Sequence, residues 1–254
     1  MKTKLNLFKG RDRADLGGPY WLIFNTLVIF FFSQILAAFI VELILSIMHP
    51  HINVAGLLDN SSAGQFFYVI LAEGLAVALV LLSLKNRRLP PRFIGLGRRP
   101  IWDDVFKALI GFTVFYGLLI VASLLVSVFL PNVNTNQQQD LGFNNITTTT
   151  DNLLAFAALV IVPPLGEEPL VRGYLFSGLR ARLKFWPAAI VTSILFGIAH
   201  LEIGGGAPLL WAAGIDTFVL SLVLVYLRES TGALYAGILV HMLNNLVAFG
   251  VHFH

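Results

Sequence analysis

Two adjacent carboxylates and an arginine interrupt an apolar stretch of the sequence. Glu167, Glu168 and Arg172 lie within this stretch, and charges inside a membrane span are costly enough to indicate a functional site. In a helix, Glu168 and Arg172 are four residues apart, in the order that favours an ion pair on one face. Glu167 then lies about 100° away around the helix, free for chemistry. The alternative is that all three charges form a structural cluster that locks one helix to its neighbours.

Further polar side chains follow in the apolar sequence at helical spacing. His200 lies four residues after Phe196, and His241 and Asn245 are also four apart, so each pair shares one face of a helix. A single histidine in a membrane span is more often a packed hydrogen-bonding group than a catalyst. Two histidines, an asparagine and a glutamate pair, on helices that can converge, are the kind of set from which helical bundles build sites.

This set of side chains favours hydrolysis by an activated water molecule. A glutamate in a poorly solvated site can act as a base near neutral pH, with a neutral histidine sharing the hydrogen bond to the water. The second histidine and the asparagine amide can donate to the oxyanion that forms when water attacks a carbonyl. The chain has no cysteine, and no serine stands in a nucleophile-elbow pattern, so a covalent intermediate has little support.

The composition indicates the environment of these side chains. Of the 254 residues, 57% are hydrophobic and 12% are charged, against about 25% charged residues in soluble domains. The mean hydropathy is +0.79. These values predict an all-α, polytopic membrane protein, a helical bundle of one compact domain. The chain has hardly any solvated face on which basic residues could bind phosphates, so we expect no nucleic-acid partner.

Seven apolar segments are candidates for transmembrane helices. They are residues 20–48, 65–84, 105–130, 152–180, 185–203, 207–227 and 232–253. Pro163 and Pro164 interrupt the fourth segment, and because proline is well tolerated at a helix start, we expect a new helix to begin there. Glu167 and Glu168 would then lie in its first turns, where the helix dipole favours anions.

The basic residues are distributed on one side only. All 17 Lys and Arg lie at the amino terminus, in the even-numbered loops or near those ends, with the exception of Arg172. This pattern predicts an integral membrane protein with a cytoplasmic amino terminus and a non-cytoplasmic carboxyl terminus. We divide the chain into a basic cytoplasmic segment (1–19), three amino-terminal transmembrane helices (20–130) and a core of four transmembrane helices (150–254), between which the active site is expected.

Three motifs of the core, in this order, resemble those of a known family. The motifs are Glu167-Glu168-x-x-x-Arg172, Phe196-x-x-x-His200 and His241-x-x-x-Asn245. They are similar to the motifs of the CPBP family, which includes the type II CAAX prenyl endopeptidases and bacterial immunity-type (Abi) membrane proteins. The resemblance covers about residues 150–250.

The resemblance implies an intramembrane endopeptidase. In such an enzyme Glu167 and His200 activate the water, and His241 and Asn245 form the oxyanion hole. Glu168 pairs with Arg172, as their spacing also indicates. Pro169 departs from the family pattern, which usually has an aliphatic residue directly after the glutamate pair. This departure concerns backbone geometry more than chemistry.

Zinc chemistry is the competing mechanism. Two histidines and a glutamate can hold zinc, but the sequence contains no His-Glu-x-x-His, so the ligands would have to come from three helices. Because metal ligands usually show tighter local spacing, we favour a reaction without a metal or other cofactor.

Three more acidic residues, Glu42, Glu73 and Asp216, lie in the spans. Asp216 is the best candidate for a supporting residue that orients a histidine. Glu42 and Glu73 are assigned no role.

A function of another class remains open. The chain could be a membrane binding protein without proteolytic activity, such as a bacteriocin-immunity factor or a scaffold for a sensor kinase. A transporter has no support, because no paired broken helices repeat in two halves. The complete set of catalytic residue types favours the peptidase. Its expected partners are the lipid bilayer of a bacterial or archaeal cell and a membrane-associated peptide or protein substrate, which the sequence does not name.

Two side chains that act on one water must lie at the same depth. Glu167 is about 15 residues into the fourth span, which descends from outside, whereas His200 lies near the outer end of the fifth. We expect the break at Pro163 to raise the carboxylates toward the histidine. The sequence thus predicts a polar cavity in the outer half of the bilayer.

Overall fold

The computed structural model describes residues 17–48, 58, 61–134, 137, 141–202 and 208–253. Within these residues the regular secondary structure is entirely helical, which confirms the predicted all-α bundle. Most of the predicted basic segment 1–19 and the end of the predicted fifth span at Ile203 lie outside the described residues.

Nine α-helices are distinguished along the described chain. They are α1 (Pro19–Met48), α3 (Ser62–Asn86), α4 (Trp102–Phe129), α5 (Thr149–Phe156), α6 (Val162–Glu168), α7 (Ser177–Arg180), α8 (Phe185–Ala199), α9 (Trp211–Thr231) and α10 (Tyr235–Phe253). A 3-10 turn, η2 (Pro91–Ile94), follows α3, and two π-helical segments, η3 (Ala157–Ile161) and η4 (Pro169–Phe176), lie between α5 and α7.

Within the described residues, six helical units are long and apolar enough to cross a membrane, so the chain is an integral, multi-pass membrane protein. These units are Pro19–Met48, Ser62–Asn86, Trp102–Phe129, Thr149–Arg180, Trp211–Thr231 and Tyr235–Phe253. The helix of the predicted fifth span, α8, is apolar but has only 15 residues.

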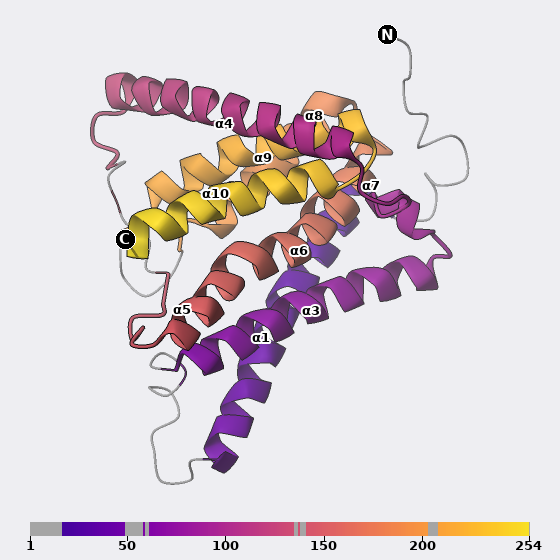
Figure 1. Cartoon of the computed structure of the whole chain (residues 1–254). Coiled ribbons are helices and arrows are strands. Elements are labelled where there is room, and N and C mark those ends of the chain that lie inside the picture. Colours follow the sequence, from indigo (N-terminus) through magenta and orange to yellow (C-terminus); the bar gives the residue numbers. More distant parts are fainter. Residues whose placement is uncertain are drawn as a thin grey trace.

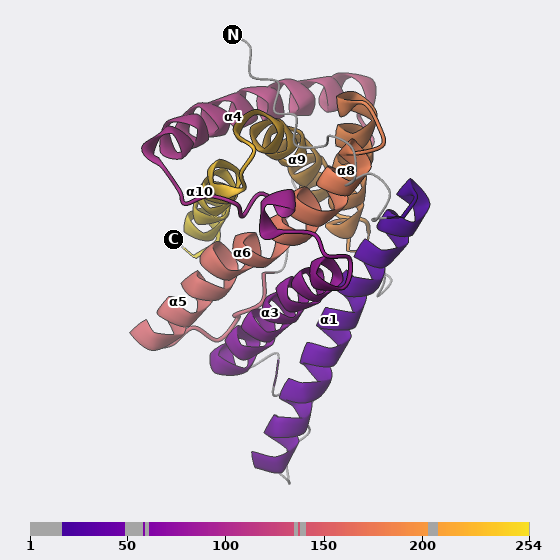
Figure 2. The ribbon, with the colours of Figure 1, turned by 90° about the vertical axis from the view of Figure 1, so that its right-hand side faces the viewer.

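The unit Thr149–Arg180 is the central helix of the bundle. It runs between the α1–α3 pair on one side and α4, α9 and α10 on the other (Figures 1 and 2). Helix α8 packs mainly on α9 and also touches η4. Half of the most apolar part of the central helix is buried inside the protein, compared with 22% for α1 and 11% for α4. The charged motif therefore lies on an element that packs between two groups of helices.

The break expected at Pro163 is not present, because α6 begins at Val162 as a direct continuation of η3. The chain is helical without interruption from Thr149 to Arg180, so Glu167 and Glu168 lie far from its first turns. A π-helical turn, η3, directly precedes the prolines, and the amide of Val162 there bonds to the carbonyl of Ala157, five residues back. This wider turn accommodates two residues that lack an N–H group within a helix that continues past them.

Glu167 and His200 lie at about the same depth although the central helix is not broken at Pro163. The central helix ends at Arg180 and α8 begins at Phe185, so both can be measured from the same edge of the bundle. Glu167 lies 13 residues before Arg180, and His200 lies 15 residues after Phe185. At about 1.5 Å per residue, these positions are about 20 Å and about 22 Å from that edge. The shortness of α8, rather than a raised carboxylate helix, brings the two side chains level.

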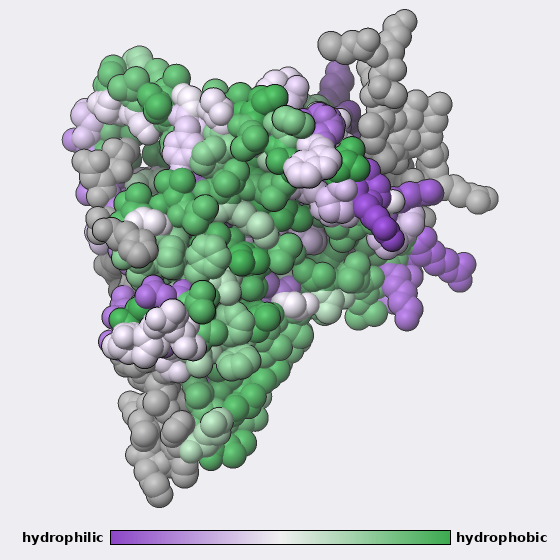
Figure 3. Space-filling model, in the orientation of Figure 1, coloured by the Kyte–Doolittle hydropathy of each residue, from purple (hydrophilic) through white to green (hydrophobic). Residues whose placement is uncertain are grey.

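The surface agrees with a membrane-embedded bundle. Figure 3 shows a broad hydrophobic band over the visible face, with hydrophilic residues gathered near the connection between α3 and α4. Exposed basic residues of this edge are Lys85, Arg88, Arg92 and Arg99. Next to them Arg98 forms a two-pronged ion pair with Asp104, which also accepts the amide hydrogen of Ile101 and so caps the start of α4.

The orientation of the bundle remains a prediction, which reporter fusions can test. A reporter fused after residue 254 should be non-cytoplasmic, and one inserted between α7 and α8 should be cytoplasmic, because the basic residues gather on that side. The opposite result at either position would contradict the predicted topology.

Candidate active site

Glu168 and Arg172 form a fully buried ion pair. Nη1 of Arg172 lies 2.8 Å from Oε1 of Glu168, and neither side chain has more than 1% of its surface exposed. The guanidinium carbon of Arg172 lies 4.1 Å from the centre of the Phe196 ring, in a cation–π contact between η4 and α8. The first and second motifs are thus joined through one arginine.

The same carboxylate orients a histidine of α10. Nδ1 of His241 lies 3.0 Å from Oε1 of Glu168. Because a carboxylate paired with arginine can only accept, His241 donates its Nδ1 hydrogen there. Its other nitrogen, Nε2, lies 3.8 Å from Oε2 of Glu167. The His241 ring therefore stands between the two adjacent carboxylates.

His200 is held by the backbone of its own helix. Its Nδ1 lies 2.8 Å from the carbonyl oxygen of Phe196, and since a carbonyl only accepts, Nδ1 carries the hydrogen. In the neutral ring Nε2 then has a free lone pair, which can accept a hydrogen bond from water. The Phe196 ring lies 4.6 Å from the His200 ring and 5.9 Å from the His241 ring, measured between centroids. Phe196 therefore contacts both histidines and the arginine.

Asn245 is oriented by the central helix. Its Nδ2 donates to the carbonyl oxygen of Leu159 at 2.9 Å. The residues four and five positions after Leu159 are Pro163 and Pro164, which have no N–H, so this carbonyl lacks both an α-helical and a π-helical donor. The asparagine supplies the missing donor and keeps one Nδ2 hydrogen available for another acceptor.

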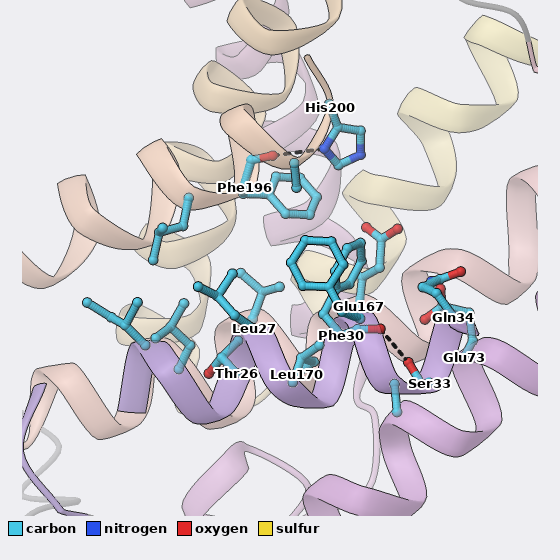
Figure 4. A pocket seen from close by; sticks show the side chains of 17 residues that line it. Thr26, Leu27, Phe30, Ser33, Gln34, Glu73, Glu167, Leu170, Phe196 and His200 are labelled. Carbon is cyan, nitrogen blue, oxygen red and sulfur yellow. Dashed lines mark hydrogen bonds between the residues drawn. The ribbon is translucent and has the colours of Figure 1, made fainter. Parts of the chain in front are cut away.

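A cavity of about 390 Å³ brings Glu167 and His200 together. Its walls come from α1, α3, the α6–η4 part of the central helix, and α8 with the following His200. Most of the lining is aliphatic or aromatic, including Leu27, Phe30 and Leu170. Figure 4 shows Glu167 near Gln34 and Glu73, with His200 facing the same space and Thr26 and Leu27 farther along the cavity. The site is thus a mainly apolar chamber with polar groups gathered toward one end.

Sequence reasoning missed the contribution of the first two helices to this chamber. Glu73 and Gln34 line it, although the first three spans carry no recognised motif. An acidic residue in an apolar span was the available signal, but nothing in the sequence indicates which helix Glu73 faces.

Asp216 lies beside the site and contacts an amide. Its Oδ2 is 3.5 Å from Nδ2 of Asn244, whose Oδ1 accepts a hydrogen bond from Tyr116 at 3.3 Å. This chain links α9, α10 and α4 behind the His241–Asn245 face. His241 is instead oriented by the hydrogen bond that its Nδ1 donates to Glu168.

Among the described residues, no three His, Asp or Glu side chains form a group that could hold a metal ion. A reaction without metal remains a prediction and is tested below.

Gly166 allows α3 to approach the central helix directly beside Glu167. A Cβ atom at this position would lie 2.6 Å from Cβ of Glu73 and would overlap its Oε2. Gly166→Ala should therefore destabilise the protein by about 1–3 kcal/mol, measured by thermal unfolding in detergent. Gly74→Ala is the matched control, because nothing lies within 4 Å of its Cβ position. Equal unfolding temperatures for the two variants would contradict the close approach.

Comparison with known proteins agrees with the position of this site. Residues 149–247 match the family described as type II CAAX prenyl endopeptidase Rce1-like. An uncharacterized 24.3 kDa protein of Escherichia coli is 33% identical over 94 residues, which make up 36% of this chain and 41% of that protein. The chain thus matches less than half of the length of this relative. No solved structure gives a significant match.

The matched region contains all three motifs and ends two residues after Asn245. Residues 149–247 of this chain are therefore similar to the type II CAAX prenyl endopeptidase Rce1-like family.

Proposed function

We propose that this protein is an intramembrane endopeptidase that cleaves a peptide bond with a water activated by glutamate and histidine. The observation that carries the proposal is the shared cavity of Glu167 and His200 inside a bundle of membrane-length helices. The similarity of residues 149–247 to the Rce1-like endopeptidases also supports this activity.

In this mechanism Glu167 is the base. It takes one proton from the water, and the free Nε2 of His200 accepts the other hydrogen as a hydrogen bond, which aims the oxygen at the substrate carbonyl. As the C–N bond breaks, the proton held by Glu167 passes to the leaving nitrogen.

His241 and Asn245 stabilise the oxyanion. Asn245 has one Nδ2 hydrogen left after its bond to Leu159. For His241 to donate from Nε2 while Nδ1 donates to Glu168, its ring must carry both protons. The carboxylates of Glu168 and Glu167, 3.0 and 3.8 Å away, favour that positive charge. A hydrogen bond from a charged donor is about twice as strong as one from a neutral donor.

Glu168 and Arg172 support the site and do not take part in proton transfer. Arg172 pairs with Glu168, and Glu168 accepts the Nδ1 hydrogen of His241, so that Nε2 of His241 points toward Glu167. Asp216 is a weaker candidate for such support, through Asn244.

The substrate in this proposal is a membrane-associated peptide or protein. The apolar chamber suits a peptide segment with bulky apolar groups beside the scissile bond, and the bilayer is the medium from which it enters. A silent binding protein would have the same cavity without turnover.

The test is cleavage of membrane peptides by the purified protein, with and without metal. Protein reconstituted in liposomes should cut apolar peptides at a defined bond, identified by mass spectrometry. Because the proposed base is a carboxylate, exhaustive treatment with a strong chelator should leave the rate unchanged. Zinc that is stoichiometric and lost together with activity would overturn the metal-free mechanism. A well-folded protein that binds peptides and never cleaves them would favour the silent binding protein.

A further inference from the structure

A third carboxylate in the cavity has no part in the mechanism above. Glu73 comes from α3, outside the matched residues 149–247. Its side chain lies against Gly166, the residue just before Glu167, and lines the same cavity as Glu167 and His200. Figure 4 shows Glu73 at the polar end of the chamber, close to Gln34. Glu73 and Glu167 also interact electrostatically.

The surroundings of Glu73 offer its negative charge little support. The titratable groups that face it are Glu167 of α6, His200 beyond α8 and Tyr68 of α3 itself. From α1 the neutral Gln34 and Ser33 line the cavity. Arg172 of the central helix is engaged with Glu168 and Phe196. In the part of the chain that the structure describes, Glu73 forms no hydrogen bond or ion pair.

Two carboxylates in such a poorly hydrated cavity cannot both ionise easily, because their charges repel each other at low dielectric. Glu167 is the better carrier of the single charge, since Nε2 of His241 lies 3.8 Å from it. Glu73 has no comparable neighbour. The proton of the pair is therefore more stable on Glu73.

We propose that Glu73 and Glu167 act as a carboxylate pair that holds one proton at neutral pH, with Glu73 as its main carrier and Glu167 ionised. The consequence for catalysis rests on the proposed peptidase function; the shared proton itself does not. The pair leaves Glu167 ready to accept a proton from water while the cavity carries one negative charge instead of two. Glu73 thereby acts through Glu167, as a positioning residue.

An activity-independent experiment tests the shared proton. Infrared spectra of the full-length protein in liposomes should contain the C=O stretch of a protonated carboxyl at neutral pH, which disappears in Glu73→Gln and persists in Glu229→Gln. In Glu167→Gln, where Glu73 keeps its place but loses the repelling neighbour, the band should titrate away about one pH unit or more lower. Glu73→Gln spectra unchanged from wild type, or no shift in Glu167→Gln, would overturn the proposal. The comparison of Glu167→Gln with the wild type retains Glu73, so it tests the shared proton even if Glu73→Gln fails to fold.

The pH profile of cleavage provides the functional readout. In the wild type kcat/KM should fall at alkaline pH, where Glu73 ionises and a second negative charge opposes formation of the oxyanion. Glutamine keeps the shape and cannot ionise, so the pH profile of Glu73→Gln should lack this alkaline decline. An identical alkaline limb in both proteins would contradict the role of Glu73. If the wild type cleaves no peptide at all, the peptidase proposal fails, while the infrared titration still reports on the pair.

Discussion

Replacing Glu167 by glutamine is expected to lower the rate of peptide cleavage by about 10²–10⁴-fold, the usual contribution of a general base. The amide has nearly the same size and still forms hydrogen bonds, but it cannot take a proton from water. Glu167 is only partly buried and has no arginine partner in the described structure, so the fold should tolerate the change. Initial rates with a cleaved membrane peptide, together with gel filtration and thermal unfolding, measure both effects.

The two adjacent glutamates serve as controls for each other. Glu168 is one residue away, and its carboxylate faces Arg172 and His241. If Glu167→Gln kept its activity while Glu168→Gln were folded and inactive, the roles of the two carboxylates would be reversed. Loss of folding in Glu167→Gln would instead favour the alternative in which all three charges form a structural cluster.

Glu168→Gln should cause the largest loss of stability. It leaves the guanidinium of Arg172, which is completely buried, without its counter-charge. Breaking one side of a buried ion pair costs about 3–5 kcal/mol, because the remaining charge is neither hydrated nor paired. We expect a lower yield and a lower unfolding temperature in detergent, and a loss of activity because His241 also loses its partner at Nδ1.

A second ion pair provides the matched control. Arg180 and Glu229 are 2.9 Å apart, with 29% and 34% of their side-chain surfaces exposed. Since exposed pairs contribute about 0–1 kcal/mol, Glu229→Gln should have little effect. Replacing Arg172 by methionine in the Glu168→Gln background removes the orphaned charge, so part of the lost stability should return. Similar losses of stability in Glu168→Gln and Glu229→Gln would contradict the expectation that burial makes the Glu168–Arg172 pair the more costly one to break.

Local spacing was the most reliable guide to this structure. The four-residue separation of Glu168 and Arg172 indicates a pair on one helix face, and the two side chains lie 2.8 Å apart. The long apolar segments likewise predict the helices, because membrane spans must satisfy their backbone groups internally. Both inferences depend only on residues that are neighbours in the sequence.

Contacts between distant segments could not be predicted in the same way. Two consecutive prolines normally end a helix, but here the chain continues because η3 widens the turn before them and Asn245, 86 residues later, bonds to Leu159. Glu73 presents the same difficulty, since only the packing of α3 on Gly166 places it beside Glu167.

The hydrogen bond from Asn245 to Leu159 has a consequence for the evolution of stability. A residue with an N–H at position 163 could close the helix on the Leu159 carbonyl and remove the defect that the proline creates. The helix would gain a local bond, and the amide of Asn245 would then have to share its acceptor with that bond. Selection for a sturdier central helix and selection for a well-aimed amide would then act in opposite directions at Pro163. The carbonyl that Pro163 leaves without a helical donor thus orients a side chain of another helix.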